Sequence, residues 1–374
     1  MQVFVFFATI VSVNTDVSQE LRQIISHYDL GGLVGYQRDE RGTVNTSFTI
    51  DLISNGEQKR YFLRRYKMGV KEEELLFEHS ILTHLLKNNF ALVSRVYPTR
   101  EGRTYVKLGG EQTTFYAIFD YLEGEDKYTW INPRCNSSET VSAAEALAGF
   151  HRAVHGWLPE GKRHEPRIVD MLPTLPGILD RGLQQGRQGA FDEYLRANRN
   201  LIFQHIEALL DFLQRPGYQA LPQLIIHCDY HPGNLKFADG KVVAMFDFDW
   251  SKSDARSFDL GLAMVYFFLS WDEADNGALR LDELEPFLAA YQRMLANDTG
   301  VGPLTLEEQM HLPALIAAGN LYVMNWALLD YYHKPVDPQE YLGYLRHHVQ
   351  LISWLGKARH RQQLEHSIHL ACAG

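Results

Sequence analysis

Cysteine is scarce in this chain of 374 residues. The only three are Cys135, Cys228 and Cys372, an odd and scattered set without metal-ligand spacing. The sixteen histidines form no His-Glu-x-x-His motif and no cluster with cysteine. These absences argue against a disulfide-built scaffold and a zinc site of the finger type. They predict reduced thiols and a cytoplasmic location.

Positive charge is also in short supply. The formal net charge is −10, and no cluster of lysine and arginine occurs. Nucleic acids and anionic membranes both attract basic surfaces, so we expect neither as a partner. The apolar run at residues 3–13 is too short to span a bilayer and lacks a basic flank. We expect residues 1–16 to be an apolar extension or a strand outside the core fold.

The remaining chain has an ordinary globular composition, with 45% hydrophobic and 22% charged residues, and is long enough for about two domains. Up to residue 123, strand-like runs alternate around one amphipathic helix at 71–86. The strand-like runs are 33–37, 44–53, 61–66, 104–107 and 114–121. Beyond residue 124, helical periodicity dominates, at 139–155, 190–214, 258–270, 281–296, 306–333 and 338–357. The predicted fold is α+β, with a small antiparallel-sheet lobe (1–123) and a mostly helical lobe (124–374).

Residues 224–249, LIIHCDYHPGNLKFADGKVVAMFDFD, carry the strongest chemical signal. Apolar runs lead to Asp229 and Asp247, and Asn234 follows Asp229 by five residues. The spacing H-x-D-x-x-x-x-N, with a second strand ending in Asp, is typical of phosphoryl transfer from a nucleotide. Asp229 would face the acceptor hydroxyl, and Asn234 with Asp247 would hold magnesium. A polar turn after a buried strand is the less favoured alternative.

These motifs, HCDYHPGN followed by MFDFDW and then Phe258-Asp259-Leu260, resemble the aminoglycoside phosphotransferase and choline kinase superfamily. That group includes type II homoserine kinases. The resemblance extends from about Ser18 to the C-terminal helices and implies the bilobal protein-kinase-like fold, with ATP and Mg²⁺ as cofactors. It implies that Asp229 is the catalytic base and that Asn234 and Asp247 bind the metal. Asp259 is interpreted as a helix cap or an anchor of the catalytic loop.

The resemblance also assigns nucleotide-binding positions in the first lobe. The segment ERGTVNTSFTI, which contains Asn45, resembles the turn that covers the phosphates. Arg64 takes the place where kinases carry a lysine, with Glu78 as its expected partner and Glu74 as the alternative. FYAIFDYLEGED resembles the hinge strand, so backbone groups up to Tyr121 and Glu123 would receive the adenine.

Residues for the acceptor are harder to assign. Asp249 lies two residues after Asp247; if the strand continues, both point to one side, and Asp249 is either a second ligand or a solvated or capping residue. Trp326 and Asp330 lie on an aromatic-rich segment that the resemblance places at the acceptor pocket. A core helix is the favoured interpretation of that segment.

We therefore predict a phosphotransferase that moves the γ-phosphate of ATP to a hydroxyl of a small molecule. Among acceptors, homoserine or another amino alcohol ranks before a sugar or an aminoglycoside, on resemblance. The alternatives are a protein Ser/Thr kinase of the bacterial stress type and a non-catalytic nucleotide-binding module marked by Arg64. The protein is expected to be a monomer or a homodimer.

Overall fold

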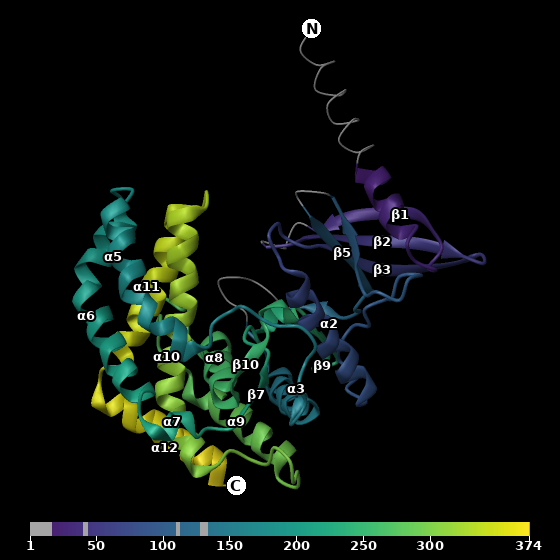
Figure 1. The fold of residues 1–374 in the computed structure, drawn as a ribbon. Coiled ribbons are helices and arrows are strands. Elements are labelled where there is room, and N and C mark those ends of the chain that lie inside the picture. The colour runs from purple at the N-terminus through teal and green to yellow at the C-terminus, as the bar shows by residue number, and fades with distance from the viewer. Residues whose placement is uncertain (1–16, 40–43, 110–112, 128–133, 374) are drawn as a thin grey trace. The chain divides into compact units, whose positions relative to one another are not determined.

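The computed structural model describes residues 17–39, 44–109, 113–127 and 134–373. The predicted apolar extension, residues 1–16, lies outside the described residues. The chain divides into two compact units (Figure 1). One runs up to Glu123 and also includes Pro159–Lys162, and the other comprises Gly124–Leu158 and the chain from Arg163 onward. The return of Pro159–Lys162 to the first unit was not predicted.

The first unit is an antiparallel sheet with the strand order β1-β2-β3-β5-β4 and two helical segments. The first helical segment ends at residue 25. The other elements are β1 (Gly32–Asp39), β2 (Thr46–Ser54), β3 (Glu57–Arg65), α2 (Glu72–Lys87), β4 (Val106–Leu108) and β5 (Thr114–Asp120). Each expected strand and the expected helix of this region is present, with shifts of a few residues at the ends.

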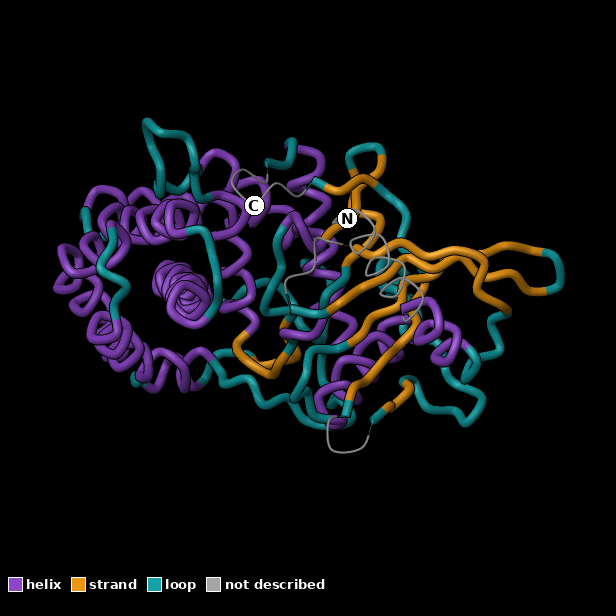
Figure 2. Tube along the Cα trace, turned by 90° about the horizontal axis from the view of Figure 1, so that it is seen from above, coloured by secondary structure: helices purple, strands orange, loops and turns teal. Residues whose placement is uncertain are grey.

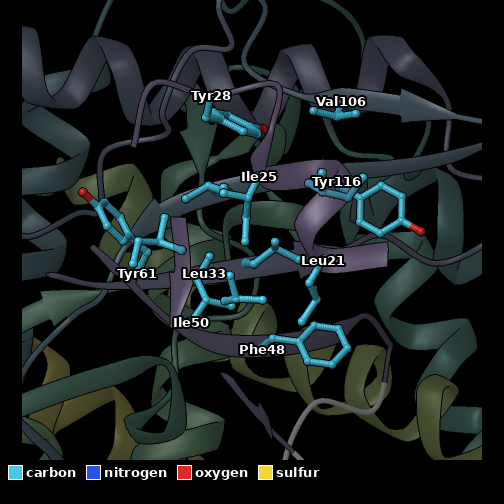
Figure 3. Close-up of a cluster of buried hydrophobic side chains, with 13 residues drawn as sticks. Leu21, Ile25, Tyr28, Leu33, Phe48, Ile50, Tyr61, Val106 and Tyr116 are labelled. Carbon is cyan, nitrogen blue, oxygen red and sulfur yellow. The ribbon is translucent and has the colours of Figure 1, made fainter. Parts of the chain in front are cut away.

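A hydrophobic cluster fixes the first helical segment on the sheet (Figure 3). Leu21, Ile25 and Tyr28 point toward strand residues such as Ile50 and Tyr116 (Figure 3), and all five are buried. Within the helix, Ile24 and Ile25 follow Leu21 by three and four residues. Along β2, Phe48, Ile50 and Leu52 alternate, so each element buries one face.

The second unit is mostly helical, as Figure 2 shows with helices in purple and strands in orange. Its helices are α3 (Ser137–Val154), α4 (Ile168–Met171), α5 (Leu175–Gln185), α6 (Ala190–Leu213), α7 (Pro216–Gln219), α8 (Arg256–Phe268), α9 (Leu281–Leu295), α10 (Leu306–His333), α11 (Pro338–Leu355) and α12 (Ala358–Ala373), with 3₁₀ turns η1 (Leu172–Thr174), η2 (Pro232–Asn234) and η3 (Phe248–Trp250). Its strands are β6 (Glu125–Asp126), β7 (Gln223–Ile226), β8 (Leu235–Ala238), β9 (Lys241–Met245) and β10 (Lys252–Ala255). They form two small sheets, β6-β8-β9 and β7-β10.

The expected helices of this unit are all observed. The short helices α4 and α7 and the longer helices α5 and α12 were not predicted. Helix α5 begins with a proline and a glycine at its first turn, which reads as a loop in the sequence. Helix α12 buries only Leu364, Ser367, Ile368 and Ala371, so its apolar stripe is faint. Packing against α9 and α10 stabilises this helix, and the periodicity of its sequence alone gives little indication of it.

Helices α8 and α10 pack closely, and glycines permit the approach. A Cβ atom on Gly261 would lie 2.8 Å from the carbonyl carbon of Leu315, and one on Gly319 would lie 3.0 Å from the Cα of Leu262. Arg256, at the start of α8, donates to both carboxylate oxygens of Glu308, at 2.6 and 2.7 Å. Glu308 also completes the capping box of α10 with Thr305. Together these contacts fix the position of α8.

Helix α10 is long and apolar enough to cross a membrane, with a mean hydropathy of 1.4 over its most apolar window. However, 67% of that window is buried within the protein. The core helices of globular proteins pass the same test of length and composition.

Three buried histidines predict a loss of stability in mild acid. Burial lowers the pKa of His79 and His348 to about 3 each and that of His347 to about 2, from 6.5. Folded, they remain neutral, whereas the unfolded chain takes up protons below pH 6.5. Stability is therefore lost as the pH falls from 6.5 toward 3, by about 1.4 kcal/mol per histidine for each pH unit.

Urea unfolding between about pH 7.5 and 5.5 would measure this slope. The matched variant is His348→Gln, whose amide can still donate to the Asn320 oxygen that the His348 Nδ1 contacts at 2.7 Å. We expect the slope of this variant to be smaller by about one histidine's contribution. An unchanged slope would contradict the assignment.

Candidate active site

The β8–β9 hairpin brings Asn234 and Asp247 together. Asn234 immediately precedes β8, and Asp247 follows β9 by two residues. The antiparallel register pairs Leu235 with Met245, and the Phe246 N–H donates to the Asn234 carbonyl at 3.0 Å. The two candidate metal ligands thus lie at the same end of one hairpin. The sequence indicated two strands here, whereas the structure uses three, β7, β8 and β9.

The carboxylate of Asp229 lies against this hairpin end. The Asn234 amide nitrogen donates to two oxygens of Asp229, the backbone carbonyl and the carboxylate Oδ2, both at 2.9 Å. The Tyr266 hydroxyl donates to Oδ1 at 3.1 Å, and His231 Nε2 lies 3.5 Å from Oδ2. Burial acts to raise the pKa of Asp229, but the nearby His231, His227 and Tyr266 outweigh it, so the pKa lies below its ordinary value. Asp229 is therefore ionised at neutral pH.

Asp259 anchors the segment that delivers Asp229. Its carboxylate accepts the backbone N–H groups of His227 at 2.8 Å and Cys228 at 2.9 Å, and it contacts His151 Nε2 at 3.0 Å. Cys228 has a φ of +63°, a left-handed conformation that is costly for a residue with a side chain. The two N–H groups that donate to the Asp259 carboxylate hold this conformation, as expected for an anchor of the loop.

Two histidines support the site from beneath. His151 is buried and contacts the Tyr291 hydroxyl at 2.8 Å as well as Asp259. His227 Nε2 lies 3.0 Å from the Phe246 carbonyl, which links the loop to the end of β9. Burial lowers the pKa of His227 in spite of Asp259 and Asp229 nearby. Both side chains thus connect the loop that carries Asp229 to the elements around it.

The expected continuation of the strand through Asp249 is wrong. Asp247 has a φ of +68°, and Phe248–Trp250 form a 3₁₀ turn, so Asp247 and Asp249 are not on one side of an extended strand. The cause is Phe248, whose buried ring packs against Phe150 and His227 at 5.6 and 4.7 Å between centroids. A second ligand role for Asp249 loses the geometric argument on which it was based.

The structure separates the two residues that were expected on α10. Trp326 contacts Trp250 at 4.6 Å between ring centroids, which places it beside the turn after Asp247. Asp330 instead pairs with Lys334 at 2.8 Å and accepts from the Tyr341 hydroxyl at 3.4 Å. Neither of these partners belongs to the Asp229 site. An acceptor role for Trp326 and Asp330 stays a prediction, and only Trp326 has a neighbour at the site.

In the first unit, Arg64 donates to Glu78 Oε1 at 2.9 Å, and both side chains are buried. Tyr66 donates to Glu78 Oε2 at 2.9 Å. The adjacent Arg65 faces the opposite side of β3, toward Glu20 at 3.5 Å. Strand alternation thus decides which arginine meets helix α2. The pair with Glu78 forms and the alternative with Glu74 does not, since Glu74 accepts the Lys71 N–H of its own capping box.

The other expected nucleotide positions lie at the ends of strands. The Asn45 side chain accepts the Lys67 N–H at 3.0 Å and so ties the start of β2 to the end of β3. Residues 40–43 of the expected phosphate turn lie outside the described residues. Tyr121 and Glu123 follow β5, and the Arg60 guanidinium lies 5.6 Å from the Tyr121 ring centroid. Their contact with a nucleotide stays a prediction.

Two residues of the site were not selected from the sequence. They are His231, in the loop between Asp229 and Asn234, and Tyr266, on helix α8. The available signal for Tyr266 was its spacing, since it follows Asp259 by seven residues and therefore lies two turns along the same face of α8.

Comparison with known proteins shows which fold and which family this chain shares. An aminopropanol kinase associated with a microcompartment has a TM-score of 0.64 at 15% identity, with coverage of 93% of this chain and 98% of its own. An aminoglycoside phosphotransferase from Alicyclobacillus acidocaldarius has a TM-score of 0.61 at 19% identity, with coverage of 92% and 96%. These neighbours define the class as the protein-kinase-like fold.

Residues 42–296 match the phosphotransferase enzyme family, and the chain belongs to that family. A homoserine kinase from Rhodopseudomonas palustris is 27% identical over 359 residues, which covers 90% of this chain and 94% of the relative. A homoserine kinase from Caulobacter vibrioides is 26% identical over 353 residues, with coverage of 88% and 95%. The protein is a small-molecule kinase.

Removal of the loop anchor should disable the site and destabilise the second unit. In Asp259→Ala, the His227 and Cys228 N–H groups lose their acceptor, and each buried donor without a partner costs about 1–3 kcal/mol. We expect a loss of several kcal/mol of stability, at the upper end of single substitutions, and a large fall in kcat. Urea unfolding and an ADP-release assay would measure the two effects, and wild-type values for both would contradict the anchor.

Proposed function

We propose that this kinase uses ATP and Mg²⁺ to phosphorylate the hydroxyl of a small amino alcohol, with homoserine as the first candidate. The observation that carries the proposal is the contact of the Asp229 carboxylate with the Asn234 amide, with Asp247 at the same end of the hairpin. Full-length similarity to homoserine kinases supports the acceptor. The scattered cysteines support a cytoplasmic location.

Asn234 and Asp247 fit a hard divalent cation. The Asn234 nitrogen is committed to Asp229, so its amide oxygen is the atom that would ligate the metal. No cluster of three or more acidic, histidine or cysteine ligands occurs among the described residues. A site with few protein ligands suits Mg²⁺, which is commonly completed by water and substrate phosphates. When bound, the metal would neutralise charge on the phosphates.

In the proposed reaction, Asp229 orients the acceptor hydroxyl and takes its proton. The hydroxyl oxygen forms a bond to the γ-phosphorus, the bond from that phosphorus to the β–γ bridging oxygen breaks, and ADP leaves with the electron pair. Arg64, held by Glu78, offsets phosphate charge. The twelve-residue interval from Asp247 to Asp259 is too short for the activation segment of protein kinases, which disfavours a peptide acceptor.

Substitution at Asp229 and Asp247 tests the two roles separately. Loss of a general base typically costs 10²–10⁴-fold, so Asp229→Ala should lower kcat by about that factor with little change in nucleotide affinity. Asp247→Ala should abolish Mg²⁺-dependent turnover and weaken Mg²⁺-dependent nucleotide binding. A coupled ADP-release assay over homoserine, choline, aminopropanol, methylthioribose, hexosamines and aminoglycosides would measure both and identify the acceptor.

Near-normal activity of Asp247→Ala would show that the metal assignment is wrong. Asp180→Asn serves as a control, because this carboxylate contacts Arg199 outside the Asp229 loop. If no small alcohol is phosphorylated but a generic protein substrate is, the acceptor class is wrong while the transfer chemistry stands.

The Arg64–Glu78 pair predicts a separable effect on stability and nucleotide binding. Arg64→Met leaves Glu78 buried without its cation, which costs about 3–5 kcal/mol. The double variant Arg64→Met/Glu78→Met should recover most of that loss and still bind ATP more weakly than wild type. Urea unfolding and calorimetric titration with a non-hydrolysable ATP analogue would measure this, and wild-type affinity in the double variant would remove Arg64 from the nucleotide site.

A further inference from the structure

We propose that Tyr266 and His231 are positioning residues that set the orientation of the Asp229 carboxylate for transfer. The inference deepens the proposed function, on which it rests. It concerns His231, at a variable position within the catalytic motif, and Tyr266, which lies outside it. Its basis is the set of donors around the two carboxylate oxygens and the way helix α8 presents Tyr266.

Helix α8 lies along the catalytic loop and contacts it at two levels. In its first turn, Asp259 accepts the N–H groups of His227 and Cys228. Seven residues later, Tyr266 reaches the side chain of Asp229. An interval of seven residues is about two turns, or roughly 10.5 Å along one face of a helix. One face of α8 thus holds both the loop backbone and the carboxylate that the loop carries.

Tyr266 is exceptional within α8. Of the thirteen residues of this helix, all of them described, it is the single one that is not buried. Its neighbours are apolar side chains that pack in the core, among them Val265 and Phe267. A half-buried tyrosine on an otherwise buried helix, with its hydroxyl 3.1 Å from Asp229 Oδ1, faces the site and adds little to the core.

His231 holds the other oxygen, and its tautomer follows from its contacts. The Gly233 N–H donates to His231 Nδ1 at 3.0 Å, so this nitrogen must be an acceptor. In the neutral ring the proton is then on Nε2, which lies 3.5 Å from Asp229 Oδ2. The His231 ring also lies beside the Tyr266 ring, at 5.1 Å between centroids.

The donors are distributed unequally over the carboxylate. Oδ2 is approached by the Asn234 amide nitrogen and by His231 Nε2, while Oδ1 has the Tyr266 hydroxyl. A carboxylate oxygen accepts about two hydrogen bonds. Oδ1 can therefore accept one more hydrogen bond, from the hydroxyl of the substrate. The contact with Tyr266 fixes the orientation of Oδ1 and so the direction from which the substrate hydroxyl approaches. We assign Oδ1 as the oxygen that receives the proton.

The substitution Tyr266→Phe removes the hydroxyl and keeps the ring. Small errors in placing a reacting group cost up to about 10²-fold, so we expect kcat to fall by roughly 10- to 100-fold. KM values for ATP and for the acceptor should change by no more than about twofold, because the hydroxyl contacts Asp229 and not the substrate. His231→Ala should also lower kcat, and His231→Gln, whose amide can donate in place of Nε2, should restore most of it.

The matched control is Tyr332→Phe. The Tyr332 hydroxyl donates to Asp192 Oδ1 at 2.8 Å, also in the second unit but outside the site, and the ring is half-buried like that of Tyr266. This substitution removes the same hydroxyl-to-carboxylate contact. It should leave kcat unchanged even if it lowers the unfolding temperature, which separates an effect on the site from an effect on folding.

A double-mutant cycle provides the decisive test. If Tyr266 acts through Asp229, the kcat of Asp229→Ala/Tyr266→Phe should equal that of Asp229→Ala within about twofold. Independent, multiplicative losses would overturn the proposal, as would a wild-type kcat in Tyr266→Phe. The assays use the best acceptor found for the wild-type enzyme. Absence of any acceptor would instead count against the proposed function.

Discussion

The hydrogen bonds from the His227 and Cys228 N–H groups to the Asp259 carboxylate are the constraint on which the second unit's chemistry depends. They hold Cys228 in a left-handed conformation that a residue with a side chain does not adopt without compensation. The chain thereby turns at Cys228 and directs Asp229 out of the core. A buried carboxylate with several strong donors gives this turn a single geometry.

The position of Asp259 is itself fixed by packing. Helix α8 contacts α10 at Gly261 and Gly319, where the backbones are close, and Arg256 joins the starts of the two helices through Glu308. Apolar burial thus sets the place of the helix, and the helix sets the place of the loop. The position of the Asp229 carboxylate is therefore set by residues that are far away in sequence.

In the first unit, a buried charged side chain is likewise held by a residue from another element. Arg64 is buried, and burial of its charge would be costly without a partner of opposite charge. Glu78, on α2, accepts a hydrogen bond from Arg64 at 2.9 Å. The guanidinium is held in one orientation, as a phosphate-binding group requires, and Tyr66 holds the second oxygen of Glu78. Arginine at this position is compatible with the fold because its planar fork pairs well with a carboxylate.

Much of the fold followed from the sequence because periodicity is a local property. The strands of the first unit and the long helices of the second were predicted from alternation and helical spacing, and the family followed from one dense motif, His227 to Asp247. Helices α5 and α12 were missed because their own sequences carry weak patterns, and tertiary contacts stabilise them.

From the sequence alone, the spacing of Asp229, Asn234 and Asp247 selects the residues that we propose for the transfer chemistry. Only the tertiary structure decided how they are held. The turn at Phe248 separates Asp249 from Asp247 because an aromatic ring is buried beneath the loop. Tyr266 reaches Asp229 because a helix 37 residues away packs beside it. Such contacts depend on the packing of distant elements, which no local pattern records.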